Sequence, residues 1–443
     1  MDPLERIAAL RLSFLARCRI PEDLESITSL GEESPGAGVG ADSVERLWSA
    51  VEALYRTGVY PAVQVCIRRE GHVVLNRAIG HASGNAPDDP VDAPKEPVTV
   101  DTPFCIFSAA KAITAMVIHK LDEQHVLHLE DPVCDFIPEF ARHGKHRVTI
   151  RHILSHRAGM PQVPRDSITL DTLAEPERVV EALCHERPRT RPGRALAYHA
   201  VTGGFILGEL VRRVTGKDVR AVLREQIAGP LGLRWLGYGV RSDEVSEVAH
   251  NAVTGPPPPP PISTALRAAL GAEPAEVVEM SNDPRFLTAI VPSANVVTTA
   301  VELSAFYQCL LDGGSLGGVR VFEPSTITHA TAEQSIWELD LTLGLPLRYG
   351  LGFMLGGQYA SVLGWDNPLA FGHVGFTNIF SWADPERDLS VAIITSGKPV
   401  LSTHAVRLVQ LMNEIHDAFP KLEGEVLHAG WRLNGHRRET AGA

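Results

Sequence analysis

Residues 104–120 read FCIFSAAKAITAMVIHK, in which Ser108 and Lys111 lie three positions apart, between an apolar run and a segment with helical periodicity. In a helix, positions i and i+3 share a face, so the hydroxyl and the amine would sit side by side. The helix macrodipole favours negative charge developing on a serine at the helix start, and a lysine among apolar neighbours can act as a base near neutral pH. By spacing alone, Ser108 could equally be a helix cap and Lys111 a surface residue.

Two further segments contain residues suited to the same chemistry. Tyr198 lies in AYHA (197–200), on a predicted loop ahead of a predicted helix, where a tyrosine either points into a cleft or fills the core. His373, Val374 and Gly375 lie in the run FGHVGFT, between two strand-like segments. Small residues there would let a substrate lie along a strand edge, where a backbone N–H can donate to an oxyanion. A glycine-rich bulge without chemistry would give the same pattern.

Apolar periodicity predicts sheet at both ends of the chain and helices in the middle, which indicates an α+β core interrupted by a helical insertion. The expected elements are a short helix at 3–18, a hairpin at 62–69 and 72–80, mostly helices over 108–230, helices at 296–311 and about 402–418, and strands at 349–355, 369–373, 377–383 and 389–396. The expected division is an N-terminal extension and linker (1–42), a sheet domain (43–107 with 290–420), a helical domain with a proline-rich loop (108–289) and a C-terminal tail (421–443).

In this order and with a helical insertion between them, the three segments resemble the serine β-lactamase and penicillin-binding-protein superfamily. The nearest branch looks like the class C β-lactamases and the related carboxylesterases called family VIII esterases. The resemblance covers about residues 45–418. It also rests on VTIRHILSHRAGMP (148–161), LAYHAVTGGFILGELVRRVTG (196–216), PLGL (230–233), NVVTTAVELSAFYQCLLDGG (295–314) and FGHVGFTNIFSWADPERDLSVAIITSG (371–397).

The resemblance implies an antiparallel sheet flanked by helices, with an inserted all-helical domain closing the active-site cleft. It also implies a covalent acyl-enzyme mechanism, with Ser108 as nucleophile and Lys111 as its base. Tyr198 would relay protons to the leaving group and then help to activate the deacylating water. The backbone N–H groups of Ser108 and Phe376 would form the oxyanion hole, and no cofactor is implied.

Two departures from the β-lactamase pattern favour a short-chain carboxylic ester as the small-molecule substrate. Where that pattern has Tyr-x-Asn, this chain has Ala200 in the third position, and where it has Lys-Thr-Gly, this chain has His373-Val374-Gly375. A lysine would be a permanent cation, whereas a histidine is mostly neutral at pH 7. Both changes remove groups that grip an anionic, amide-bearing antibiotic, so a carboxylesterase leads a β-lactamase or peptidase.

Two alternatives to ester hydrolysis remain at this point. The same machinery could pass the acyl group to an alcohol or amine, as an acyltransferase does, and exclusion of water from the cleft decides between these outcomes. A non-enzymatic scaffold could bind partners through the six prolines at 256–261. A scaffold of this kind would have no function for the reactive side chains of Ser108, Lys111 and Tyr198.

Composition excludes several classes of function. The formal charge of −12 over 443 residues disfavours nucleic acid as a partner. No apolar run has the length of a membrane helix, and charged residues interrupt the first twenty positions, so neither a membrane span nor export is expected. Six scattered cysteines without a CxxC pair indicate free thiols in a reducing compartment, which predicts a cytoplasmic protein. An oligomer stays open.

Two other local patterns are interpreted as structural. Residues 313–317 match the GxSxG nucleophile motif, but the serine follows a predicted helix rather than a strand, which favours a loop. No metal site is expected, because none of the histidines forms HExxH or has an acidic partner at typical ligand spacing. The histidines considered, of which His152 and His156 are expected to brace the helix beneath the active site, are His119, His125, His128, His143, His146, His152 and His156.

Overall fold

A central antiparallel sheet organises the molecule. The computed structural model describes residues 16–34, 39–163 and 169–422, so most of the helix expected at 3–18 and most of the tail from 421 lie outside the described residues. The sheet has the strand order β1-β3-β2-β15-β14-β13-β12, with β4 beside β3. Its strands are β1 (Thr28–Leu30), β2 (Ala62–Arg69), β3 (His72–Ser83), β4 (Glu96–Pro97), β12 (Met354–Leu355), β13 (Phe371–Gly375), β14 (Ile379–Asp384) and β15 (Leu389–Thr395).

The middle of this sheet joins the two ends of the chain. β2 and β3 form a hairpin through a two-residue turn in which Glu70 and Gly71 both have positive φ, as a tight hairpin turn requires. β2 then pairs with the whole length of β15, from Arg69 opposite Leu389 to Val63 opposite Thr395. The predicted hairpin and the strands predicted at 369–373, 377–383 and 389–396 are therefore confirmed. The strand predicted at 349–355 is wrong except for Met354–Leu355, because the chain folds back there and Tyr349 pairs with Met354.

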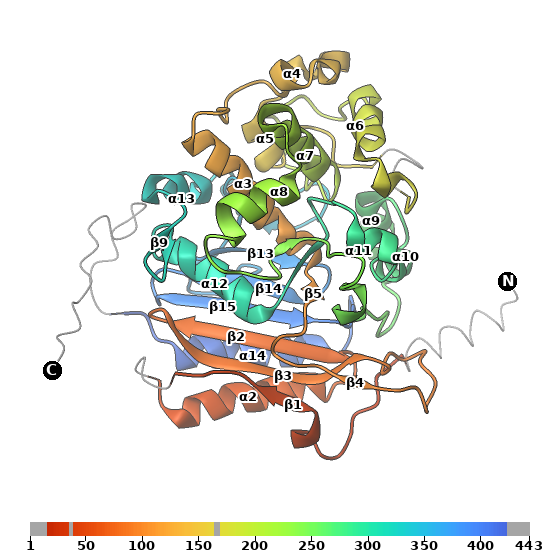
Figure 1. Ribbon diagram of the computed structural model, residues 1–443, viewed down its shortest axis with the longest axis vertical. Coiled ribbons are helices and arrows are strands. Elements are labelled where there is room, and N and C mark those ends of the chain that lie inside the picture. The colour runs from red at the N-terminus through yellow and green to blue at the C-terminus, as the bar shows by residue number, and fades with distance from the viewer. Residues whose placement is uncertain (1–15, 35–38, 164–168, 423–443) are drawn as a thin grey trace, which may run out of the picture.

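Helices cover both faces of the sheet (Figure 1). On one face α2 (Ala41–Tyr55) packs against α14 (His404–Ala418), and on the other α12 (Ala300–Leu311) lies on β15 and β2. The apolar spacing of α2 directs Leu47, Val51 and Leu54 into the core. The sequence-based fold class, an antiparallel sheet flanked by helices with a helical insertion, is confirmed.

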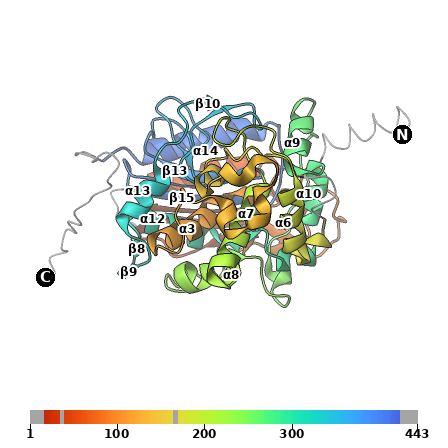
Figure 2. The same cartoon turned by 90° about the horizontal axis from the view of Figure 1, so that it is seen from above.

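The middle of the chain forms a helical region above the sheet. Seen from above, α3 (Ala110–Glu123) and α7 (Thr202–Thr215) lie side by side at its centre (Figure 2). The other helices are α4 (Val133–Phe136), α5 (Ile150–Leu154), α6 (Pro176–His185), α8 (Val219–Leu223), α9 (Ile262–Leu270), α10 (Pro274–Met280), α11 (Pro284–Thr288) and α13 (Pro324–Thr331). Single turns lie at η1 (Glu25–Ile27), η2 (Phe107–Ala109), η4 (Thr172–Ala174) and η6 (Val245–Glu247), with longer irregular turns at η3 (Pro138–Arg147) and η5 (Arg224–Ala228). The exact division into domains stays a prediction.

A small sheet links the helical region to the main sheet and corrects one sequence-based element. β7 (Val296–Thr298) pairs with β5 (Phe104–Cys105) and with β6 (Gly237–Tyr238). The helix predicted at 296–311 therefore begins only at Ala300, where the side chain of Thr299 caps it. The β-branched run VVTT supports the strand in place of the first helical turn. Two further pairs of antiparallel strands have two residues in each strand. They are β8 (Ser315–Leu316) with β9 (Val319–Arg320), and β10 (Glu338–Leu339) with β11 (Pro346–Leu347).

The state of the cysteines agrees with the composition-based expectation of free thiols. All six cysteines have free thiols, of which five are buried and Cys134 is half-buried. Among the described residues, none of the helices has both the length and the apolarity that crossing a bilayer demands.

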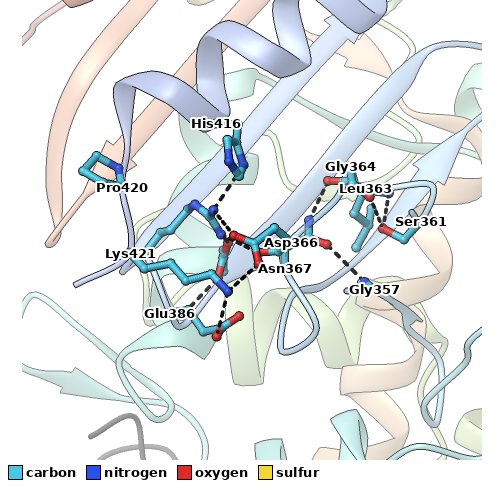
Figure 3. A network of polar contacts seen from close by, with 12 residues as sticks. Gly357, Ser361, Leu363, Gly364, Asp366, Asn367, Glu386, His416, Pro420 and Lys421 are labelled. Atoms are coloured by element: carbon cyan, nitrogen blue, oxygen red, sulfur yellow. Dashed lines mark hydrogen bonds and ion pairs between the residues drawn. The ribbon is translucent and has the colours of Figure 1, made fainter. Parts of the chain in front are cut away.

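An ionic network with a buried pair at its centre joins Lys421, which follows α14, to the turn between β14 and β15 (Figure 3). The Arg387 guanidinium donates to Asp384 Oδ2 at 3.0 Å and to Asp366 Oδ2 at 3.2 Å. The ammonium of Lys421 lies between Asp366 Oδ1, at 2.9 Å, and Glu386 Oε1, at 3.1 Å. Burial raises the pKa of Asp384, and the adjacent Arg387 opposes that shift.

Removing Arg387 should destabilise the fold strongly. Arg387→Met is expected to lower the free energy of unfolding by about 3–5 kcal/mol, because a buried Asp384 loses its partner. Asp384→Asn in the same chain should recover part of that loss. Urea denaturation followed by circular dichroism measures both.

Arg46→Met is the matched control for Arg387→Met. Arg46 forms an exposed pair with Glu414 at 3.9 Å, so its loss should change the free energy of unfolding by less than about 0.5 kcal/mol. Equal losses in the two variants would contradict the role given to the buried network.

Candidate active site

Ser108 lies at a strained junction between β5 and α3. Ile106 continues the strand by donating its N–H to Val296 O at 2.9 Å. Phe107 then takes a φ of +47°, a left-handed conformation that bulky residues rarely adopt. This turn places Ser108 in the single turn η2, immediately before α3, with its side chain partly exposed. The hydroxyl thus lies at the positive end of a helix.

Lys111 lies on the first turn of α3 and its amine contacts Ser108, as the i, i+3 spacing predicts. Nζ lies 3.1 Å from Ser108 Oγ, 2.7 Å from Ala200 O and 3.2 Å from Ser293 O. The side chain is buried, and desolvation lowers its pKa from 10.5 to about 7. A neutral amine can donate its two N–H bonds to the two carbonyls, which leaves its lone pair for the Ser108 hydroxyl.

Tyr198 lies on the loop before α7 and faces the same pair. Lys111 Nζ lies 4.9 Å from the centre of its ring. Burial raises the pKa of the phenol, and a hydrogen bond with Ser108 opposes that shift. Tyr198 is therefore a neutral O–H group in contact with the serine hydroxyl.

Two residues that position the site had no signal in the sequence. Asp340 is fully buried, and its Oδ1 accepts the N–H of Tyr198 at 3.0 Å while its Oδ2 accepts the hydroxyl of Tyr349 at 3.2 Å. Ser293 supplies a carbonyl to Lys111, and its hydroxyl accepts the N–H of Gly204 on α7 at 3.1 Å. Neither residue lies in a recognisable motif, so only the fold identifies them.

β13 brings the third segment against the serine. A Cβ at Gly375 would overlap the carbonyl oxygen of Ile106, so only glycine allows this approach of β13 to the chain before η2. The rings of Phe376 and Phe107 consequently pack together, with their centres 5.9 Å apart. Among the described residues, neither Ser108 N–H nor Phe376 N–H has a backbone carbonyl partner in the turns and loops.

His373 is a neutral, buried imidazole beside Tyr198. The centres of the two rings lie 6.2 Å apart. Its Nδ1–H donates to Val374 O at 2.8 Å, and its Nε2 is buried without a partner among the described residues. Burial and the nearby Lys111 lower the pKa of His373 to about 3. The third segment therefore presents a hydrogen-bond acceptor and not a cation. Val374 is half-buried beside it.

Histidines of the helical region take two different roles. His152 forms a capping box with Thr149 at the start of α5, which agrees with the structural role expected of it. His156 instead packs against the active site, with its ring 4.7 Å from that of Tyr198 and 5.1 Å from that of Tyr349. A cavity next to Lys111 is lined in part by His156, His199 and Ser293.

The GxSxG match at 313–317 is part of a hairpin. Ser315 starts β8, which follows the end of α12 and pairs with β9. The interpretation that this serine is no nucleophile elbow agrees with the structure, because no strand leads into it and no helix follows it directly.

Comparisons with known proteins point to one family. The family described as Beta-lactamase matches residues 48–412. The esterase/beta-lactamase LipL of Mycobacterium tuberculosis is 29% identical over 73% of this chain and 76% of its own. A crystal structure of a family VIII carboxylesterase covers 86% of this chain and 99% of its own, at 28% identity and a TM-score of 0.71. A penicillin-binding protein homolog from Caulobacter crescentus has the same coverage, 29% identity and a TM-score of 0.73.

Gly375→Ala should damage catalysis while leaving the fold intact. The added methyl pushes β13 away from Ile106, and a displacement of about 1 Å at a reacting centre costs on the order of 10²-fold in rate. Initial rates on p-nitrophenyl butyrate and circular dichroism of the same samples measure the two effects.

Gly40→Ala is the control for Gly375→Ala. A Cβ at Gly40 meets no described atom within 4 Å, and its φ of −70° suits alanine. A normal rate in Gly375→Ala would show that the approach of β13 is not needed for activity.

Proposed function

The chain belongs to the beta-lactamase family, and we propose from this that it is a serine hydrolase that cleaves short-chain carboxylic esters through a covalent acyl-enzyme on Ser108. The observation that carries the proposal is the buried amine of Lys111, 3.1 Å from Ser108 Oγ and with a pKa lowered to about 7. An amine in this state is a general base poised for neutral pH. The esterase names of the relatives support the choice of ester.

In the acylation step, Lys111 Nζ takes the hydroxyl proton of Ser108 while Oγ attacks the ester carbonyl. The carbonyl oxygen becomes an oxyanion, which the N–H groups of Ser108 and Phe376 stabilise. When the intermediate collapses, the bond from carbon to the leaving alkoxide breaks. Tyr198, a neutral phenol in contact with Ser108, passes a proton to that alkoxide, and the proton held by Lys111 replaces it.

Deacylation reverses these roles with water as the nucleophile. Tyr198 accepts the proton of the attacking water while it passes its own proton to Lys111. The bond between the acyl carbon and Ser108 Oγ then breaks, and Lys111 returns the proton to Oγ. The products are a carboxylic acid and the free enzyme. His373, Val374 and Gly375 are proposed to contact the acyl chain along the edge of β13, where the bare Nε2 of His373 can accept a hydrogen bond.

The charge of the site favours a neutral ester over an anionic lactam. His373 stays neutral because its pKa is lowered to about 3, so the third segment supplies no cation for a carboxylate. Lys398 also lies near the site, against the ring of Phe107. Its amine is buried, donates to Thr395 O at 2.6 Å, and has a pKa lowered by desolvation to about 7. It is not a permanent cation aimed at the substrate.

The alternatives differ in their products. An acyltransferase would release butyl butyrate from p-nitrophenyl butyrate and butanol, whereas a hydrolase releases butyrate. A peptidase-type or β-lactamase enzyme would turn over an amide or lactam on the same serine. A cytoplasmic location stays a prediction.

Ser108→Ala should abolish ester hydrolysis. The rate on p-nitrophenyl butyrate is expected to fall by about 10³-fold or more, because no acyl-enzyme can form. Initial rates on this ester and on a chromogenic cephalosporin, measured for both proteins, test the mechanism and the substrate class together.

Ser315→Ala, at the serine of the GxSxG match, is the control and should retain the full rate. A full rate in Ser108→Ala would disprove the assignment of the nucleophile. Turnover mainly of the cephalosporin would instead reverse the preference for esters.

The pH profile should report the base. Neutral Lys111 is the active form, so kcat/KM is expected to fall about tenfold per pH unit below pH 7 and to level off above it. His373, with a pKa near 3, should add no second limb between pH 5 and 8. Lys111→Arg, whose side chain stays charged, should be inactive across this range. A flat profile in the parent protein would contradict a lysine base.

A further inference from the structure

A cluster of metal-ligating side chains lies at the end of α3 that is remote from Ser108. It consists of His119 and Asp122 on α3 and His329 on α13, and we name it the α3–α13 cluster. The potential ligand atoms of the three residues all lie within 4.8 Å of one another. His119 and Asp122 share one face of α3 because they are three positions apart. None of these residues takes part in the proposed ester chemistry.

His119 has a buried ring nitrogen without a hydrogen-bond partner among the described residues. Its ring is 1% exposed, and its Nε2 lies 3.0 Å from Leu351 O. A carbonyl only accepts hydrogen bonds, so Nε2 carries the proton and Nδ1 has the lone pair. Nδ1 is buried without a partner among the described residues. A backbone carbonyl that fixes the tautomer in this way is the usual support of a metal-binding histidine.

The other two members complete a set of nitrogen and oxygen ligands. His329 Nδ1 lies 3.9 Å from Asp122 Oδ2, and the rings of His329 and His119 lie 6.1 Å apart. The side chains of Asp122 and His329 are 21% and 43% exposed, so an ion can enter from solvent and both groups can adjust. His128 Nδ1 lies 3.5 Å from Asp122 Oδ1, from the loop after α3.

One neighbour opposes a cation at this place. Arg151 Nη2 lies 3.4 Å from His329 Nε2. Its guanidinium is also held by Glu130 and, at 3.0 Å, by Gln334 Oε1. The contact with His329 is long for a hydrogen bond, so a small rotation of His329 releases it while Glu130 balances the charge.

We propose that the α3–α13 cluster binds one Zn²⁺ ion through His119 Nδ1, a carboxylate oxygen of Asp122 and a ring nitrogen of His329, with His128 or water as the fourth ligand. Imidazole nitrogens and a carboxylate are ligands that Zn²⁺ takes in tetrahedral geometry. At Zn–N distances of about 2.1 Å, neighbouring ligand atoms are roughly 3.4 Å apart, so the widest separation in the cluster, at most 4.8 Å, has to shrink by up to about 1.4 Å.

The ion would clamp α3 to α13 at the end of α3 opposite to the catalytic pair. Its role is therefore structural, and it does not depend on the proposed function. This inference departs from the sequence-based expectation that the histidines at 119–128 only pack or face solvent. Spacing along the chain could not reveal the site, because His329 follows His119 by about two hundred residues.

Binding is tested on the full chain without an affinity tag, after treatment with a chelator. Titration with ZnCl₂ in a calorimeter should give one ion per chain with a Kd of about 1 µM or tighter. Asp122→Asn and His329→Gln, both at partly exposed positions, should each weaken binding at least about tenfold. His146→Gln, at an exposed histidine outside the cluster, is the control and should bind as the parent does.

Co²⁺ reports the identity of the ligands. Visible absorption bands of tetrahedral Co²⁺ that disappear in His329→Gln but persist in His146→Gln would support the site. Three results would overturn the proposal: no binding by the parent protein, equal binding by all variants, or a thiolate charge-transfer band that places the ion at a cysteine. Circular dichroism of each variant without metal establishes that a loss of binding is not a loss of fold.

Discussion

The burial of one amine is the constraint on which the site depends. Lys111 Nζ joins three parts of the chain, because it contacts Ser108 in the turn before α3, the carbonyl of Ala200 before α7 and the carbonyl of Ser293 before β7. Both carbonyls are fixed by the packing of α3 against α7 and the small sheet. The same packing that excludes water from the amine lowers its pKa, so tertiary structure and reactivity share one cause.

The sequence was sufficient to predict those parts of the fold and the site that depend on interactions between residues close together in the chain. The i, i+3 spacing places Ser108 beside Lys111 in any helix, and alternation with a two-residue turn defines the β2–β3 hairpin. The strand Val296–Thr298 was missed because an apolar run of this length fits either a helix or a strand until a partner strand is known. Asp340 was missed for a related reason, since its partners Tyr198 and Tyr349 are brought to it only by folding.

Close backbone approach explains the placement of the third segment. Gly375 next to Ile106 and Gly204 next to Ser293 lie where a side chain would overlap the neighbouring segment. Both contacts join the sheet or the small-sheet loop to the helical region, and both converge on the surroundings of Ser108 and Lys111. A glycine at such a position allows two segments to approach closely. The sequence shows the glycine but does not show which segment lies against it.

The pairing of β2 with β15 has a consequence for folding during translation. β2 is almost wholly buried in the finished sheet, yet its partner follows it by more than three hundred residues. At a synthesis rate of about 5–20 residues per second, the edge of β2 that pairs with β15 stays unpaired for roughly 15 to 65 s, until the ribosome has synthesised β15. During that interval the hairpin is an open, apolar strand edge that other chains can join. Slow translation or crowded expression should therefore favour aggregation of this protein over its folding.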